Sequence, residues 1–368
     1  MELTIQGVDY KYSVRIGSSI LKNQLSAILS ACREKSIYLL TNETVYRLYR
    51  NLIDDSIPAG IRSHSFVLPD GEKYKNIGGI TRIYDFLLRN EASRNDLLIA
   101  FGGGVIGDMG GFAAATFMRG IPYIQVPTTL LSQVDSGIGG KTGVNHTRGK
   151  NLIGAFKQPL ATIADIDFLQ TLPPREFDAG YAELIKHGLI RDRRLFEMLE
   201  GISCRDLSEN KPLLEDAIYR SCKVKAHVVE RDEKEHGIRS LLNFGHTIGH
   251  FIETYTDYRK YLHGEAVVVG MDFAAWWSMN RGEIDESEYL AVRDHLRRLG
   301  IRVRIADLDR SSFLSIVGHD KKATRSGIRF IGLKGIGEGA VFAGVPLEEL
   351  WTDFRKYATG EFSLISAI

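Results

Sequence analysis

The sequence is poor in cysteine, carries almost no net charge and contains no long uninterrupted apolar run. Its three cysteines, Cys32, Cys204 and Cys222, are far apart and form no CxxC pair, so we expect reduced thiols and no disulfide framework. The 47 Lys+Arg nearly balance the 46 Asp+Glu, which gives no general attraction to nucleic acid or to an anionic membrane. Any basic binding site must therefore be local.

Signals for membrane insertion and secretion are also missing. The longest apolar run begins at Ala266, is interrupted by Asp272 and is too short to cross a bilayer. Residues 1–17 alternate like strands and lack the charged start and apolar core of a signal peptide. We therefore expect a cytoplasmic protein that binds neither membranes nor nucleic acid.

The pattern of apolar residues changes near residue 170. Before it, short apolar runs alternate with amphipathic stretches, and the runs lie at 36–41, 64–69, 96–102 and 123–127. This alternation predicts βαβ units and a mostly parallel sheet, as in a Rossmann-like α/β domain.

After residues 172–178, apolar residues recur three and four apart, which predicts a mainly α-helical domain. The helical segments are 182–190, 213–230, 263–279 and 287–300, and a late hairpin is expected from 329–333 and 340–345. We place the α/β domain at residues 1–172 and the helical domain at 173–368, with adjacent prolines at the boundary.

A glycine motif follows the predicted strand at 96–102. Gly102, Gly104 and Gly107 match G-x-G-x-x-G before a helical segment, so backbone amides there could approach a pyrophosphate. The usual acidic ribose partner about twenty residues on is absent, and Asp108 sits where it would repel a phosphate unless it points elsewhere. The motif is therefore either a nucleotide-binding loop or a tight turn without a ligand.

A second polar cluster lies between residues 127 and 156, among glycines that let a ligand approach the backbone. Its members are Thr128, Thr129, Asp135, Lys141, Lys150 and Asn151. Two ammonium groups and an amide in a glycine-rich loop suit a phosphorylated or carboxylated small molecule. The alternative is a solvated loop with ordinary surface lysines.

Three histidines point to a metal site in the helical half. His246 and His250 are four apart on a predicted helix and so share a face, and His263 follows after a turn-like segment. Glu183, in an otherwise apolar helical segment, could supply the hard ligand of a His-His-Glu zinc set. HExxH is absent, spacing does not decide which two histidines bind, and buried histidines are often simply hydrogen-bonded core residues.

Several distinctive segments follow one another along the chain, from DGEKYK near residue 70 to HDKK at 319–322. Between these two lie GGGVIGD, MRGIPYIQVPTTLLSQVDSGIGGKTGVNH, GKNLIGAFKQP, AELIKHG, LLNFGHTIGH and HGEAVVVGM. In their order, and roughly in their spacing, these segments resemble the 3-dehydroquinate synthase family. The resemblance implies a two-domain cyclase of the shikimate pathway that depends on NAD and on zinc or cobalt.

Its implied reaction turns 3-deoxy-D-arabino-heptulosonate 7-phosphate into 3-dehydroquinate and phosphate. The family oxidises the C5 alcohol with NAD, eliminates phosphate, reduces the ketone again, opens the ring and closes the carbocycle in an aldol step. Oxidation comes first because a C5 ketone acidifies the C6 proton and so permits β-elimination.

The resemblance also implies roles for individual residues. The metal ligands would be Glu183, His246 and His263, with His250 beside the metal. The substrate phosphate would be held by Lys141, Asn151, Lys321 or Lys322, and Arg119 given across a homodimer interface. The substrate carboxylate and hydroxyls would be held by Lys186, Lys225, Arg239 and Asn243, with Lys150 and Asp135 at the site. NAD would contact Asp70, Gly71, Glu72, Lys73, Tyr74, Lys75, Gly104, Val105, Ile106, Gly107, Asp108, Thr128, Thr129, Lys141, Lys150, Phe168, Leu169, Gln170 and Thr171.

Three alternatives remain at this point. The first is a related sugar phosphate cyclase, above all one with an amino substrate, which would share this framework. The pattern of 2-deoxy-scyllo-inosose synthases fits less well. The residues that follow the dehydroquinate pattern instead are Asp108, the GGKTG segment at 139–143, Arg239 and Asn243. The second is an NAD- and metal-dependent polyol dehydrogenase of the glycerol dehydrogenase type, which would need no residues to bind a substrate phosphate. A binding protein without catalysis is disfavoured by the intact metal and lysine set.

Overall fold

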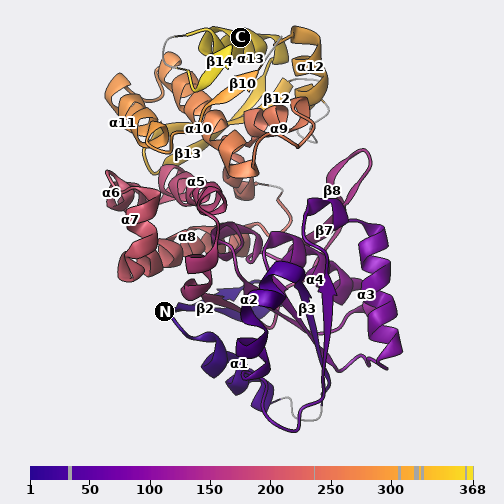
Figure 1. Ribbon diagram of the computed structural model, residues 1–368. Helices are drawn as coiled ribbons and strands as arrows, with labels where there is room; N and C mark the ends of the chain where they lie inside the picture. The colour runs from indigo at the N-terminus through magenta and orange to yellow at the C-terminus, as the bar shows by residue number, and fades with distance from the viewer. Residues whose placement is uncertain are drawn as a thin grey trace. The chain divides into compact units, whose positions relative to one another are not determined.

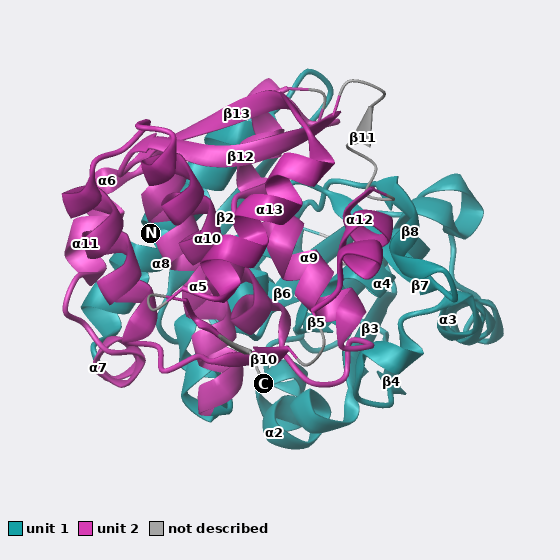
Figure 2. Cartoon of the chain, turned by 90° about the horizontal axis from the view of Figure 1, so that it is seen from above, with its two compact units in different colours: residues 1–173, 210–230 teal, residues 174–209, 231–368 magenta. Residues whose placement is uncertain are grey.

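The computed structural model describes residues 1–31, 35–235, 237–305, 308–318, 323–324, 327–360 and 363–367. These residues form two compact units, coloured separately in Figure 2. Unit 1 contains residues 1–173 and 210–230, and unit 2 contains residues 174–209 and 231–368. The sequence predicts a single division at residue 172, whereas residues 210–230 pack with unit 1. Within the described residues, no helix is long and apolar enough to cross a membrane.

Unit 1 is built on a seven-stranded sheet with the order β1-β2-β9-β6-β5-β3-β4. Figure 1 labels two of these strands, β2 and β3. Neighbouring strands are parallel except for β1 and β2. The strands are β1 (Glu2–Gln6), β2 (Lys11–Gly17), β3 (Ile37–Asn42), β4 (Ser63–Leu68), β5 (Leu97–Gly102), β6 (Tyr123–Pro127) and β9 (Ala161–Asp165). The predicted α/β fold is confirmed, and β3 to β6 coincide with the four predicted runs.

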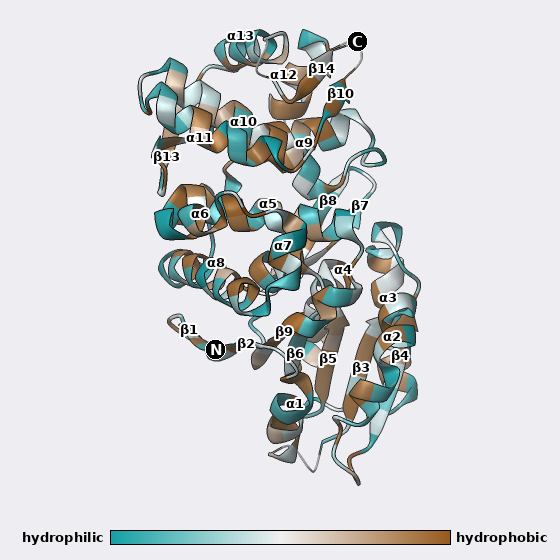
Figure 3. Cartoon of the chain, turned by 60° about the vertical axis from the view of Figure 1, so that its left-hand side comes forward, coloured by the Kyte–Doolittle hydropathy of each residue, from teal (hydrophilic) through white to brown (hydrophobic). Residues whose placement is uncertain are grey.

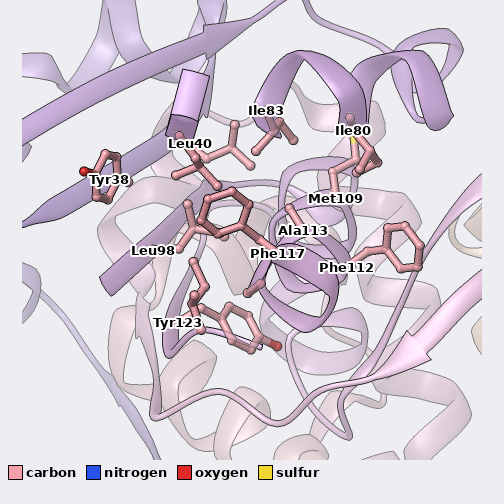
Figure 4. Packing of buried hydrophobic residues seen from close by; sticks show 14 of the residues in the cluster. Tyr38, Leu40, Ile80, Ile83, Leu98, Met109, Phe112, Ala113, Phe117 and Tyr123 are labelled. Atoms are coloured by element: carbon pink, nitrogen blue, oxygen red, sulfur yellow. The ribbon is translucent and has the colours of Figure 1, made fainter. Parts of the chain in front are cut away.

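Helices cover both faces of this sheet because its strands are apolar on both sides. In β3, Tyr38 and Leu40 pack in a cluster with α3 and α4 (Figure 4), whereas Ile37 and Leu39 pack in a second cluster with α1 and α2. Figure 3 shows β3, β5 and β6 in the hydrophobic colour. The helices of unit 1 are α1 (Leu21–Ser30), α2 (Glu43–Asp54), α3 (Ile77–Arg89), α4 (Gly104–Thr116) and α8 (Lys211–Arg231).

Part of the segment expected as a glycine-rich loop is a β-hairpin, so that expectation is wrong for residues 141–156. Here β7 (Lys141–His146) pairs antiparallel with β8 (Gly149–Phe156). Gly143 and Gly154 face each other, and a Cβ on Gly143 would lie 2.6 Å from the carbonyl oxygen of Ile153. The glycines that suggested a loop instead let two strands approach closely.

The sheet has a point where its strand order reverses, between β3 and β5. From β3 the chain adds β4 on one side, and it then adds β5, β6 and β9 on the other. Because these strands are parallel, their carboxyl ends lie at one edge, with Asn42 opposite Leu68 and Gly102 opposite Pro127. In open α/β sheets, ligands bind at this edge beside such a switch point.

Unit 2 is mainly helical, which confirms the prediction for the C-terminal part. Its helices are α5 (Pro174–Arg191), α6 (Arg193–Leu199), α7 (Cys204–Glu209), α9 (His246–Tyr255), α10 (His263–Asn280), α11 (Glu286–Arg297), α12 (Arg310–Gly318) and α13 (Leu347–Ala358). Its strands are β10 (Val303–Ile305), β11 (Ala323–Thr324), β12 (Gly327–Gly335), β13 (Glu338–Val345) and β14 (Ile365–Ala367). The predicted late hairpin is present as β12 and β13.

The core of unit 2 contains a carboxyl group, Asp272 of α10. The hydroxyl of Tyr357 donates to its Oδ2 at 2.5 Å, and the Tyr357 oxygen accepts from the amide of Leu364. Burial raises the pKa of Asp272 to about 6, against the opposing effects of the Tyr357 hydrogen bond and of nearby arginines. Between its ordinary pKa and this value the folded state holds a proton that the unfolded state releases, so stability falls as pH rises through that window.

Asp272→Asn should therefore stabilise the protein at pH 8 but not at pH 4. Asn keeps an acceptor for Tyr357 and removes the buried charge, and a pKa displacement of about two units corresponds to at most about 3 kcal/mol in the free energy of unfolding. Urea unfolding at the two pH values measures the difference. Equal effects at both pH values would mean that the Asp272 carboxyl is not held against ionisation.

Candidate metal and nucleotide sites

The three residues expected to bind metal come from three helices of unit 2. Glu183 lies within α5, His246 is the first residue of α9 and His263 is the first residue of α10. Gly245, with φ 78°, turns the chain into α9, and a Cβ on Gly270 of α10 would lie 1.8 Å from the Gly245 carbonyl oxygen. Backbone packing without side chains thus sets His246 directly against α10.

The ligand atoms of Glu183, His246 and His263 converge. They lie within 4.8 Å of one another, and His246 Nε2 is 4.0 Å from Glu183 Oε1. The Nδ1 atoms of the histidines bond elsewhere: His246 to the carbonyl of Phe244 at 3.1 Å and His263 to Glu253 Oε2 at 3.1 Å. Each outer bond leaves Nε2 as the available ligand atom, which is the usual arrangement behind metal-binding histidines.

The side chains of this cluster have the chemistry of metal ligands. Neither oxygen of buried Glu183 has a hydrogen bond within the described residues, although the ammonium of Lys186 forms an ion pair with it. Burial, Lys186 and the other two histidines lower the pKa of His246 well below its ordinary value, so its imidazole is neutral. Burial opposes protonation of His263, but Glu253 outweighs burial and raises its pKa. A neutral imidazole, a second imidazole backed by a carboxylate and a buried carboxylate fit a divalent metal.

A competing set consists of His250, Glu253 and His263, whose ligand atoms also lie close together. His250 is exposed, and the carboxylate of Glu253 already accepts from His263. We therefore favour Glu183, His246 and His263 as ligands, with His250 beside them; its ring centroid is 5.4 Å from that of His246. Glu253 was not identified from the sequence as a residue of this site. Its only signal in the sequence is that it is an acidic residue in an apolar helical segment.

Arg239 and Asn243 lie in a short 3-10 helix, η5 (Ile238–Asn243). The guanidinium of Arg239 donates to the carbonyl of Glu233, and Asn243 Nδ2 donates to Glu235 Oε1 at 2.6 Å. Arg239 is buried although it carries a charge. Their role as substrate ligands stays a prediction.

In unit 1, the glycine motif forms the predicted turn between a strand and a helix. Gly102 ends β5, Gly103 precedes α4 and Gly104 begins it, so the open amides of the first turn point out at the sheet edge. Val105, Ile106 and Gly107 complete that turn. A Cβ on Gly110, one turn further, would lie 2.7 Å from that of Ala100, so α4 packs directly on the sheet.

Asp108, in the next turn of α4, forms an ion pair with Lys75. Lys75 Nζ donates to Asp108 Oδ2 at 2.5 Å and to Asn151 Oδ1 at 2.7 Å. Burial raises the pKa of Asp108, and Lys75 acts against that rise. The sequence suggested that Asp108 would repel a phosphate, and the buried ammonium group of Lys75 offsets that negative charge. Lys75 also links α4 to the β7–β8 hairpin.

The other residues expected to contact NAD divide into exposed and buried ones. Thr128 follows β6 and its amide donates to the carbonyl of Gly102, while Thr129 bonds to Ser132. Gly71, Glu72 and Lys73 are exposed and Tyr74 is half-buried, in or beside η1 (Glu72–Tyr74). Phe168 and Leu169 are buried core residues, whereas Gln170 and Thr171 are exposed.

Two residues at this edge were missed in the sequence, Asn42 and Thr44. Asn42 ends β3 and its side chain accepts from the amide of Val45 at the start of α2. Thr44 donates through its hydroxyl to Asp70 Oδ2 at 2.9 Å. Asn42 is a residue type that often caps helices, and it ends a strand that is apolar in the sequence. This pattern could have indicated the start of a helix at the sheet edge, with Thr44 in its first turn.

The cationic residues expected to hold substrate differ in their surroundings. Lys225 of α8 forms an ion pair with Asp135 at 2.5 Å. Lys141 is exposed at the start of β7, Lys150 is half-buried in β8, and Arg119 is exposed with φ 66° in the short helix η2 (Phe117–Arg119). Lys321 and Lys322 lie outside the described residues.

Comparison with known proteins identifies the family to which this sequence is similar. Residues 65–179 match the model described as 3-dehydroquinate synthase N-terminal, and residues 180–323 match the model described as 3-dehydroquinate synthase C-terminal. A 3-dehydroquinate synthase of Nitrosospira multiformis is 48% identical over 336 residues, which is 91% of this chain and 92% of the relative.

Solved structures with the same fold include two sugar phosphate cyclases. A 2-deoxy-scyllo-inosose synthase complexed with carbaglucose-6-phosphate, NAD+ and Co2+ is 26% identical, with a TM-score of 0.83 over 97% of this chain and 100% of that one. A 2-epi-5-epi-valiolone synthase from Streptomyces hygroscopicus with NAD+ and Zn2+ bound is 27% identical, with a TM-score of 0.83 over 95% of this chain and 98% of that one.

Proposed function

The chain belongs to the 3-dehydroquinate synthase family, and we propose that it converts 3-deoxy-D-arabino-heptulosonate 7-phosphate to 3-dehydroquinate and phosphate with NAD and a divalent metal, zinc or cobalt. The observation that carries the proposal is the cluster of Glu183, His246 and His263. In this cluster, the Nδ1 atom of each histidine forms a hydrogen bond with a partner outside the cluster. We assign the metal to unit 2 and the NAD-binding loop to unit 1. We further propose a cytoplasmic homodimer in which Arg119 serves the partner's site.

In the metal centre, each residue has a separate task. The bound metal supplies a Lewis acid for substrate hydroxyl and carbonyl oxygens, and NAD supplies a reversible hydride acceptor. Phe244 and Glu253 engage Nδ1 of His246 and of His263, so that Nε2 of each ring remains available to the metal. Lys186, which is 1% exposed, brings a positive charge to Glu183 and can hold an anionic oxygen of the substrate.

The phosphate is held, in this proposal, by Lys141, Asn151, one of Lys321 and Lys322, and Arg119 given across the dimer interface. Lys150 of β8 is assigned to the substrate site beside them. Lys141 at the start of β7 supplies an ammonium group, and Asn151 supplies directional hydrogen bonds from its amide. Its φ of 53° turns the backbone at the start of β8, and its Oδ1 accepts from Lys75. These groups can stabilise the charge that the leaving phosphate gains during elimination.

The NAD site is assigned to the loop after β5 and its neighbours at the sheet edge. Amides at the start of α4 suit the pyrophosphate, because the first turn of a helix has unpaired donors and a partial positive charge. Lys75 offsets the charge of Asp108 in the next turn. The exposed residues at 70–73 and 170–171, together with Thr44, are available for the rest of the dinucleotide.

One assay separates this reaction from the alternatives. The protein is incubated with the heptulosonate phosphate, metal and a small amount of NAD, while phosphate and NADH are followed together. Phosphate release far beyond the amount of NAD, without lasting NADH, is expected of the cyclase. Steady NADH formation on a polyol would instead indicate a dehydrogenase, and preference for an amino analogue would indicate the amino-substrate cyclase.

Lys141→Ala should weaken substrate binding while leaving the metal in place. Loss of one charge-assisted contact to phosphate corresponds to about 1.5–3 kcal/mol, or roughly tenfold to a hundredfold. Isothermal titration with a phosphonate analogue of the substrate measures the affinity, and metal analysis of the same sample provides the control. An unchanged affinity would remove Lys141 from the phosphate site.

A further inference from the structure

The start of α10 lies along one face of α5. Arg175, Ala179 and Glu183 are spaced by four residues in α5 and therefore share that face. Three consecutive residues of α10, 263–265, each meet one of them. The contacts run from an ion pair at one end, through a backbone contact, to the metal ligands at the other end.

The outer contact is a two-pronged ion pair. Arg175 Nε donates to Glu265 Oε1 at 2.7 Å, and Arg175 Nη2 donates to Glu265 Oε2 at 2.8 Å. The same Nη2 donates to the carbonyl of Lys260 at 3.2 Å. Glu265 Oε2 also accepts from the amide of Leu262 at 2.8 Å, which caps α10. Arg175 therefore holds both the capping carboxylate and the chain that enters the helix.

The middle contact permits no sideways movement toward α5. A Cβ on Gly264 would lie 2.2 Å from the carbonyl oxygen of Ala179 and 2.5 Å from its Cα. The two helix backbones thus touch at this point without an intervening side chain. No side chain lies between the two backbones that could change its rotamer to accommodate a movement. A small rotation of the first turn of α10 therefore displaces its side chains relative to α5.

The inner contact is the pair of ligands Glu183 and His263. His263 is the first residue of α10, so no preceding helical turn supports it. Its side chain is held by Glu253, but its backbone position depends on how the first turn of α10 is capped and docked. A metal site requires its ligand atoms to be placed within a few tenths of an ångström, so this placement decides its affinity.

We infer that Arg175, acting through Glu265, is a positioning residue that holds His263 in register with Glu183 for metal binding; the inference rests on the metal site proposed above. Arg175 is 58% exposed and Glu265 is 14% exposed. Because the Arg175 end of the pair is open to solvent, we expect the pair to contribute little to the stability of the fold. Loss of the pair should therefore change the metal site more than the stability of the protein.

The test compares Arg175→Gln and Glu265→Gln with the control Arg193→Gln. Arg193 lies in α6 of the same unit, is 62% exposed and donates to Glu197 at 2.8 Å, so its replacement removes the same charge and a similar surface pair. Each metal-free protein is titrated with Co2+ in competition with a chelator. The d–d absorption of bound Co2+ reports the coordination geometry, and thermal unfolding of the metal-free proteins reports their stability.

We expect both Arg175→Gln and Glu265→Gln to bind Co2+ about tenfold more weakly, with an altered d–d spectrum and an unchanged melting temperature. The double variant should be no weaker than either single variant, because one ion pair accounts for both effects. Arg193→Gln should match the wild type. Wild-type affinity and spectrum in both single variants would overturn the inference while leaving the metal site intact. Failure of the wild type to bind Co2+ would overturn the metal site, and the inference with it.

Discussion

His263→Ala should lower the affinity for zinc by at least about a hundredfold and abolish turnover. Partners behind a metal ligand already contribute about tenfold to a hundredfold to affinity, and loss of an inner ligand costs more. The variant would leave Glu183 and His246 as a two-ligand site, with Glu253 losing its bond to the ring. Metal content after dialysis against a weak chelator, measured by mass spectrometry, gives the result.

The matched control for His263→Ala is His250→Ala. His250 lies on the same helix as His246 but is exposed, and it belongs to the set that we do not favour. Its replacement should leave one equivalent of metal bound. Loss of metal from His250→Ala together with its retention in His246→Ala would reverse the assignment and place the ion on His250, Glu253 and His263.

Lys75→Met should destabilise the protein by about 3 kcal/mol at pH 8, because removing one partner of a buried ion pair leaves the other charge uncompensated. Lys75 is 5% exposed and its partner Asp108 is 16% exposed. Burial already raises the pKa of Asp108, and Lys75 opposes that rise. Without Lys75 the folded state favours the protonated acid, so the loss should shrink as pH falls toward 5. Urea unfolding at pH 5 and pH 8 measures both values.

The double variant Lys75→Met with Asp108→Asn provides the control for this pair. Removing both charges should recover most of the stability, because no unpaired charge remains. The NAD affinity of both variants, measured by quenching of tryptophan fluorescence, should remain reduced, since the assigned loop loses the ammonium group of Lys75 in each. A loss of stability that is equal at both pH values and persists in the double variant would mean that Lys75 acts through packing alone.

The sheet of unit 1 could be predicted where its strands contain several large apolar residues. β3, β4, β5 and β6 have that character, and their alternation with amphipathic segments indicated parallel pairing. β9, with the sequence ATIAD, is as short as β6 but has only one large apolar side chain, so it does not stand out. The β7–β8 hairpin was read as a loop because glycines that permit close strand contact also occur in loops.

The candidate metal site could be predicted only as a set of residue types. Helical spacing brought His246 and His250 to one face, but the choice between them depends on contacts among helices that are distant in sequence. Glu183 became a ligand candidate because it is acidic in an apolar segment. The Glu253 bond to His263, the Gly245 contact with Gly270 and the Arg175 pair with Glu265 are tertiary contacts that no local pattern encodes.

Anomalous diffraction at the zinc edge, from crystals of the zinc-loaded protein, tests the central claim most directly. We expect one strong peak about 2.0–2.2 Å from a carboxylate oxygen of Glu183 and from Nε2 of His246 and of His263. A peak on His250 and Glu253, or no peak at these helices, would contradict the metal centre on which the proposed chemistry depends.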